Sequence, residues 1–250
     1  MPVADKTKAV KSLTKNSFPT NNSFISYKKL LYDEFVDKLK ITYSLLSPVI
    51  TNGGYMTFDA LLAGLIFDQT GDVDKAHSDI PLLNTQGVWH ASAAFAEKID
   101  TTKKGFVANL HAQHDLDLDL IAKSKNGLKP HRSLGLASRR LFGAVLNSYK
   151  QFSATEITWY AEGDADAIAQ LLKGVEFIGK RRASGFGQVG RLNIEPADLD
   201  GLMGHFGEPL RPVPQELFKG DRSSVKADAA WRPAYWHPLN RAICLVPEVL

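Results

Sequence analysis

The chain has 250 residues, 44% of them hydrophobic, with 30 Lys and Arg against 27 Asp and Glu and a single cysteine. These values suit one large globular domain, or one domain with a sizeable insertion, that buries an ordinary core. They exclude a membrane-spanning helix, intrachain disulfides and zinc sites built on several thiolates, and the polar, Lys-rich start is not a secretory signal. We therefore expect a cytoplasmic protein that binds no membrane, metal or other cofactor.

The first half of the chain predicts one strand–helix–strand unit. Residues 1–25 are rich in Lys, Ser, Thr and Asn and are interpreted as a flexible polar arm. Apolar and polar residues alternate over 39–45, which is the period of a half-buried strand. Thr57 is suited to cap a following helix whose first turn contains Asp59. Residues 87–96 are then expected to form a second strand.

The second half predicts another unit of the same kind. Residues 155–160 are β-branched and aromatic, which favours a strand. A helix with apolar residues at helical spacing follows, and residues 189–194 form the last strand. Two such units predict an α+β fold with a ferredoxin-like, RNA-recognition-motif-like core. Residues 26–250 would form this single domain, with 105–150 inserted as a basic thumb.

The C-terminal part is expected to contain no long helix, because six prolines are distributed over it from Pro209 onward. We predict a β or irregular extension that runs over the surface. Cys244 stands in an apolar Ile-Cys-Leu-Val run and is predicted to be a core residue.

Charge is uneven along the chain although its net value is only +3. Residues 121–150 carry seven Lys and Arg and no acid, and residues 179–191 carry four and no acid. Such segments attract polyanions even when the whole protein is nearly neutral. The alternative is a pair of solvated loops that only aid solubility. Two basic segments, one of them among glycines, favour a nucleic-acid ligand.

Three stretches approach known motifs without meeting their requirements. Residues 185–190 match G-x-G-x-x-G, but a strand rather than a helix is predicted after them, which disfavours a dinucleotide fold. Residues 174–181 approach a P-loop but place Arg181 where a magnesium-binding hydroxyl is needed. The alternating acids at 115–119 start like an EF-hand loop that lacks its glycine and glutamate. We therefore expect neither an NTPase nor a calcium site.

Residues 179–189, Gly-Lys-Arg-Arg-Ala-Ser-Gly-Phe-Gly-Gln-Val, are the strongest functional signal, and we call them the glycine loop. Glycines allow the backbone to approach a ligand closely and to expose N–H groups toward anions. Arginine matches phosphate oxygens with its forked donors, and Phe186 offers a ring on which a base can stack. The alternative is a basic turn between a helix and a strand, with Phe186 in the core.

The glycine loop resembles that of the CRISPR-associated RAMP superfamily. More narrowly, the chain is similar to the type IV effector-complex subunit that binds the 5′ handle of the guide RNA. Three further stretches add to the similarity: Ser47-Pro48 with residues 58–63, Gly163-Asp164 leading to 179–180, and the aromatic-proline segment 231–238. The similarity covers residues 38–250.

The resemblance implies a ferredoxin-like core with a protruding thumb, no metal, and a capping subunit that holds the 5′ handle. Its partners would be the guide RNA, the backbone and large subunits of the complex, and target double-stranded DNA. The expected RNA-binding residues lie in the glycine loop and in the thumb: Lys180, Arg181, Arg182, Ser184, Gly185, Phe186, Gly187, Gln188, Lys129, His131, Arg132, Arg139 and Arg140.

The alternative function is a metal-independent endoribonuclease that processes guide-RNA precursors, because related RAMP proteins cleave such precursors with His, Tyr or Lys side chains. The candidate catalysts are His131, Tyr235 and His237. General acid–base catalysis needs a positioned group with a tuned pKa, and none of the three stands in a pattern typical of a nuclease. We therefore expect a non-catalytic RNA-binding subunit.

Overall fold

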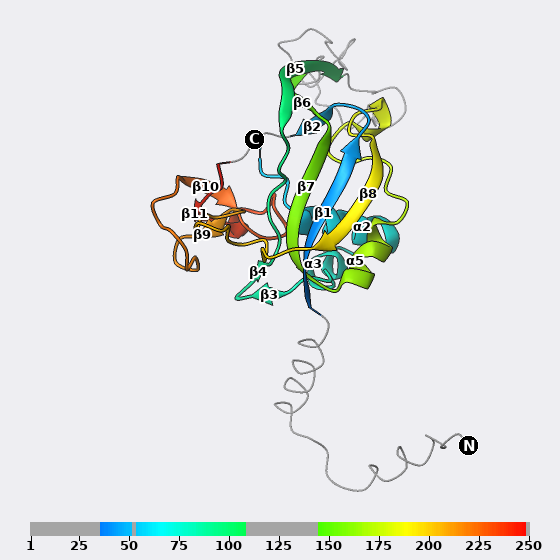
Figure 1. Cartoon of the computed structure of the whole chain (residues 1–250). Helices are drawn as coiled ribbons and strands as arrows, with labels where there is room; N and C mark the ends of the chain where they lie inside the picture. Colours follow the sequence, from blue (N-terminus) through cyan, green and yellow to red (C-terminus); the bar gives the residue numbers. More distant parts are fainter. Residues whose placement is uncertain (1–35, 52–53, 109–144, 249–250) are drawn as a thin grey trace, which may run out of the picture.

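The computed structural model describes residues 36–51, 54–108 and 145–248. These residues form small antiparallel sheets with few helices, so the expected α+β class is confirmed. Figure 1 shows helices on one side of a central sheet, a β-hairpin that projects at one end, and a C-terminal sheet beside them. No helix in this described part is long and apolar enough to cross a membrane.

The central sheet has the strand order β7-β1-β8, and both neighbours run antiparallel to β1. These strands are β1 (Asp37–Leu45), β7 (Glu156–Gly163) and β8 (Val189–Pro196). All three were predicted from their apolar patterns. The alternation in β1 has the expected consequence, because Leu39, Ile41 and Tyr43 are buried while Lys40 and Thr42 between them are partly exposed.

The strand expected over residues 87–96 does not form as one element. The structure has only the short pair β3 (Asn84–Thr85) and β4 (Val88–Trp89), followed by isolated bridges from Ala91 and Phe95 to β7. The carbonyls of Trp89 and Ala91 accept hydrogen bonds from a buried arginine, and the amides of residues 93 and 94 donate to two different segments. These backbone groups form hydrogen bonds, but not with one neighbouring strand.

The helices α2 (Phe58–Thr70) and α5 (Ala165–Leu172) cover one face of the central sheet (Figure 1). Their buried apolar residues join those of the sheet in one core cluster. Asp164 caps α5 with a side-chain bond to an amide in its first turn. The short α3 (Val73–Ser78) follows α2 and is capped by Asp72.

The predicted helix start is confirmed, since Thr57 is the N-cap residue and Asp59 lies in the first turn of α2, but the expected capping bond from the Thr57 side chain does not form. The Thr57 hydroxyl donates to Tyr235 at 2.9 Å instead. Asp59 is fully buried and faces the Arg211 guanidinium. Both side chains are drawn into an interior polar network, which outweighs the local cap and dipole interactions.

A second sheet, in the order β2-β6-β5, carries the projecting hairpin. Its strands are β2 (Val49–Thr51), β5 (Lys98–Ala108) and β6 (Val145–Ala154). The described ends of the expected thumb, residues 105–108 and 145–150, are the paired ends of β5 and β6. The remainder of the thumb and the arm 1–25 lie outside the described residues.

The C-terminal part forms a third sheet rather than a chain that only runs over the surface. It contains β9 (Val213–Pro214), β10 (Lys226–Ala230) and β11 (Arg241–Leu245). Cys244 is buried, as predicted, and it belongs to a small core of its own. Within the described residues beyond Leu210, the only helical element is the short η3 (Pro238–Asn240), so the absence of a long helix there is confirmed.

Candidate nucleic-acid interface

The glycine loop connects α5 to β8 and lies against the edge of β2. The amide of Lys180 donates to Ile50 O at 2.9 Å, and the amide of Gly187 donates to Pro48 O at 2.8 Å. Gly187 has φ +73°, and a Cβ there would lie 1.9 Å from Ile178 O. Only glycine fits this position, so at least one of the loop glycines is required for the close approach of two backbone segments.

About half of the backbone amides of the glycine loop are used by the chain itself. Six of them donate to acceptors within the chain, which differs from the expectation that they face an anion. These are the amides of Lys180, Ser184, Gly185, Gly187, Gln188 and Val189. At these six positions, contacts to a phosphate must therefore come from side chains.

Arg181 lies in an aromatic cage formed by the hairpin. Its guanidinium carbon is 4.6 Å from the ring centre of Phe106 and 5.2 Å from that of Tyr149. Lys180 Nζ lies 5.7 Å from the Tyr149 ring, and the Phe186 ring meets Phe106 edge-on at 5.7 Å. These contacts fix the loop to the hairpin by cation–π and aromatic interactions.

Phe106 and Tyr149 are the members of this surface that the sequence did not reveal. Phe106 lies in β5, which carries three lysines, and Tyr149 lies in β6 directly before Lys150. The two are paired with different residues along the β5–β6 ladder. The signal available in the sequence was an aromatic residue within two positions of a lysine in each segment.

The cations of the glycine loop remain largely available. Lys180 and Arg182 are exposed, and so are Ser184, Gly185 and Gln188. The only carboxylate paired with a loop cation in the described part is Asp68, whose Oδ2 lies 3.7 Å from Arg182 Nη1. Both side chains of this pair are more than half exposed, at 54% and 56%, and such pairs contribute little. Phe186 is half-buried, and Gly187 is buried.

The predicted thumb residues Lys129, His131, Arg132, Arg139 and Arg140 lie outside the described residues. The structure therefore brings together the glycine loop and the base of the hairpin, and it leaves the position of these five side chains as a prediction.

Two of the candidate catalysts are described, and both are engaged in structural contacts. Tyr235 donates to Asp59 and accepts from Arg211 and Thr57, and burial raises its pKa strongly. His237 Nδ1 accepts the amide hydrogen of Leu239 at 3.2 Å at the start of η3.

Arg211 is the centre of the buried polar network. It is fully buried and donates to the carbonyls of Trp89 and Trp231 at 2.6 Å and 2.8 Å. Its Nη1 lies 3.2 Å from Asp59 Oδ1. Burial is the largest single effect and lowers the pKa of this guanidinium, but the charges and hydrogen bonds of Asp59 and Tyr235 together outweigh burial, and the net direction is upward. The network joins α2, the β4 region and the C-terminal segment around Tyr235.

Comparison with known proteins gave one family and a remote structural likeness. A chain of the cryo-EM structure of the Type III-B Cmr-beta bound to cognate target RNA has 9% identity and a TM-score of 0.33. The match spans 70% of this chain and 66% of that chain, and we base no conclusion on it. No individual curated protein matched. The family description CRISPR type IV associated protein Csf3 matches residues 37–247, and the chain therefore belongs to this CRISPR type IV family.

Proposed function

We propose that this chain is a non-catalytic RNA-binding subunit of a type IV CRISPR ribonucleoprotein effector complex. It holds the 5′ handle of the guide RNA and contacts the neighbouring backbone and large subunits. The observation that carries the proposal is an exposed basic loop, anchored on an aromatic cage, in a chain of this family.

The chemistry of the interface rests on side chains. Lys180 and Arg182 offer exposed cationic donors for phosphate oxygens. Arg181 keeps its charge unneutralised by any described carboxylate, since its close contacts are two rings. A ring-held guanidinium loses little conformational freedom when a phosphate binds, which favours a fixed register for the strand.

The strand arrangement supports a ferredoxin-like core for this subunit. The bridges from Ala91 and Phe95 place residues 91–95 beside β7, which extends the order β8-β1-β7 by a fourth member. This is the order expected when two strand–helix–strand units interleave in one antiparallel sheet. In such a core the helices cover one face and the other face is open to partners.

The engaged states of Tyr235 and His237 support a non-catalytic role. A general acid or base must reach the proton that it transfers. The Tyr235 hydroxyl is saturated by three partners, and the acceptor nitrogen of His237 is used by the backbone.

The test is binding of a fluorescent single-stranded RNA, transcribed from the CRISPR repeat of the same locus, to the purified chain. A lost hydrogen bond to a charged group corresponds to about a ten- to hundredfold loss of affinity. We expect that loss for K180E/R182E and a steep fall of affinity with salt for the unmodified chain. R222E, at an exposed arginine of the C-terminal part, should bind normally. Equal binding by all three proteins would contradict the proposal, and magnesium-free cleavage of the RNA would favour the endoribonuclease.

A further inference from the structure

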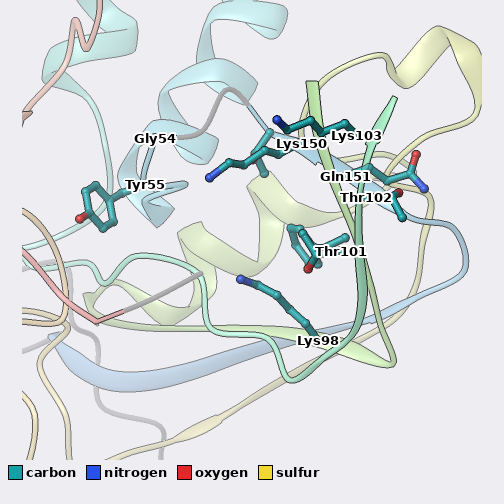
Figure 2. A pocket seen from close by; sticks show the side chains of 10 residues that line it. Gly54, Tyr55, Lys98, Thr101, Thr102, Lys103, Lys150 and Gln151 are labelled. Carbon is teal, nitrogen blue, oxygen red and sulfur yellow. The ribbon is translucent and has the colours of Figure 1, made fainter. Parts of the chain in front are cut away.

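A cavity of about 450 Å³ lies on the face of the β2-β6-β5 sheet, away from the aromatic cage. We call it the lysine pocket. Figure 2 shows three lysine side chains that extend from β5 and β6 toward the side on which Tyr55 lies. The described residues that line it are Thr51, Gly54, Tyr55, Lys98, Thr101, Thr102, Lys103, Lys150, Gln151 and Phe152. None of these residues is acidic.

The strand register places two of these lysines directly opposite each other. Lys103 pairs with Lys150 in the β5–β6 ladder, so both side chains leave the same face of the sheet. Like charges in this position repel each other. Lys98 adds a third positive charge to the same cavity. Among the described residues, no carboxylate lies within ion-pair distance of any of the three. An anion bound between these lysines would relieve the repulsion between their charges.

Tyr55 lies at the boundary of the lysine pocket, and its ring is turned away from the three lysines (Figure 2). One side of this residue packs against the small C-terminal core around Cys244, and the tyrosine also lines the pocket. Tyr55 also lines an adjoining second cavity. A base whose phosphate lies between the lysines can extend to the ring there and stack on it, and stacking is tolerant of base identity. A phosphate site and a stacking ring in adjoining cavities match the size and chemistry of one nucleotide.

The lysine pocket is continuous with the surroundings of the glycine loop. The second cavity, of about 640 Å³, shares Thr51, Gly54 and Tyr55 with it and is also lined by Gly179 and Lys180. A strand held by the glycine loop can therefore reach the lysine pocket along this second cavity.

We propose that the lysine pocket binds one nucleotide of the RNA strand, with its phosphate between Lys103 and Lys150 and its base against Tyr55. This inference rests on the proposed function, since it concerns the same strand at a second contact. It assigns RNA contact to a segment that is separate from both the glycine loop and residues 109–144.

The decisive variant is Lys150→Glu, because it separates binding from stability. It should weaken binding of the repeat-derived RNA at least tenfold and lower the slope of log affinity against log salt by about 0.7 per lost phosphate contact. It should also raise the midpoint of thermal unfolding without RNA, since a repulsive pair becomes attractive. The matched control is Lys226→Glu, an exposed strand lysine opposite Leu245 rather than a second lysine, which should change neither quantity.

Tyr55 is tested with Y55F and Y55L, which keep an apolar side chain of similar size. Y55F should bind RNA normally, and Y55L should bind more weakly. RNA binding by K150E equal to that of K226E, with K180E/R182E still impaired, would overturn the inference and leave the proposed function intact. Absence of RNA binding by the unmodified chain would instead remove the proposed function. If the pocket instead takes free nucleotides, K150E should abolish binding of uridine monophosphate but leave RNA affinity unchanged. That result would also overturn the inference.

Discussion

Replacing Arg211 by methionine should destabilise the protein severely, because it leaves the Asp59 carboxylate buried without a cation. Arg211 and Asp59 are both fully buried, with Nη1 and Oδ1 3.2 Å apart. Removal of one partner of a buried ion pair costs about 3–5 kcal/mol. The carbonyls of Trp89 and Trp231 each lose the hydrogen bond from the guanidinium in the same variant. Methionine fills similar space, so the loss is mainly electrostatic rather than a cavity effect.

The assay is urea unfolding followed by tryptophan fluorescence, with thermal unfolding as a second measurement. For a domain of this size, 3–5 kcal/mol corresponds to a decrease in Tm of roughly 6–20 °C. The matched control is Arg241→Met, because Arg241 Nη2 also lies 3.2 Å from its partner, Asp228, but the two side chains are 43% and 63% exposed. Its loss should cost about 1 kcal/mol or less.

The double variant D59N/R211M completes the argument, since it removes both charges. It should be more stable than the sum of the two single effects predicts, by at least about 1 kcal/mol. If R211M unfolds with the same free energy as R241M, or if the two substitutions are additive, the buried pair is not what joins α2 to the C-terminal part.

Three other substitutions or titrations test separate contacts. Gly187→Ala should destabilise the fold by more than Gly185→Ala in urea unfolding, because both have positive φ but only a Cβ at 187 meets a backbone oxygen, while nothing lies within 4 Å at 185. Cys244 should react with a thiol reagent only after unfolding, since burial raises its pKa to about 11. Because the thiol of the unfolded chain ionises at lower pH than that of the folded protein, the free energy of unfolding should decrease as pH rises from about 9 to about 11. Arg181→Gln should increase amide hydrogen exchange in the β5–β6 hairpin, as its guanidinium contacts two hairpin rings, and unchanged exchange would exclude the cage as an anchor.

The sequence predicted the elements in which apolar residues recur with the regular period of a strand or a helix. The alternation in β1, the aromatic β-branched run of β7 and the apolar spacing of α5 were all read correctly. Residues 87–96 were not, because their hydrogen bonds go to Arg211 and to scattered backbone groups that no local period encodes. Asp59 was placed correctly in the first turn of α2, but its buried partner Arg211 comes from a distant segment and could not be predicted.

The candidate site was predictable as a loop but not as a surface. The glycine loop stands out within a few consecutive residues, whereas its aromatic cage depends on where the hairpin folds. The lysine pocket was hidden more completely, because Lys103 belongs to a stretch that is acidic on average and Lys150 to a basic one. Only the register of the β5–β6 ladder brings them opposite each other.

The structure also changes what the loop glycines are for. Their amides are mostly bonded within the chain, and Gly179 and Gly187 sit so close to the backbone of residues 50 and 178 that a side chain would not fit. The glycines therefore allow the loop to lie against the backbone of Ile50 in β2 and of Ile178. In this position Arg181 contacts the two hairpin rings. The same hairpin carries Lys103 and Lys150. The two proposed RNA contacts are therefore connected through the contact of Arg181 with the hairpin rings.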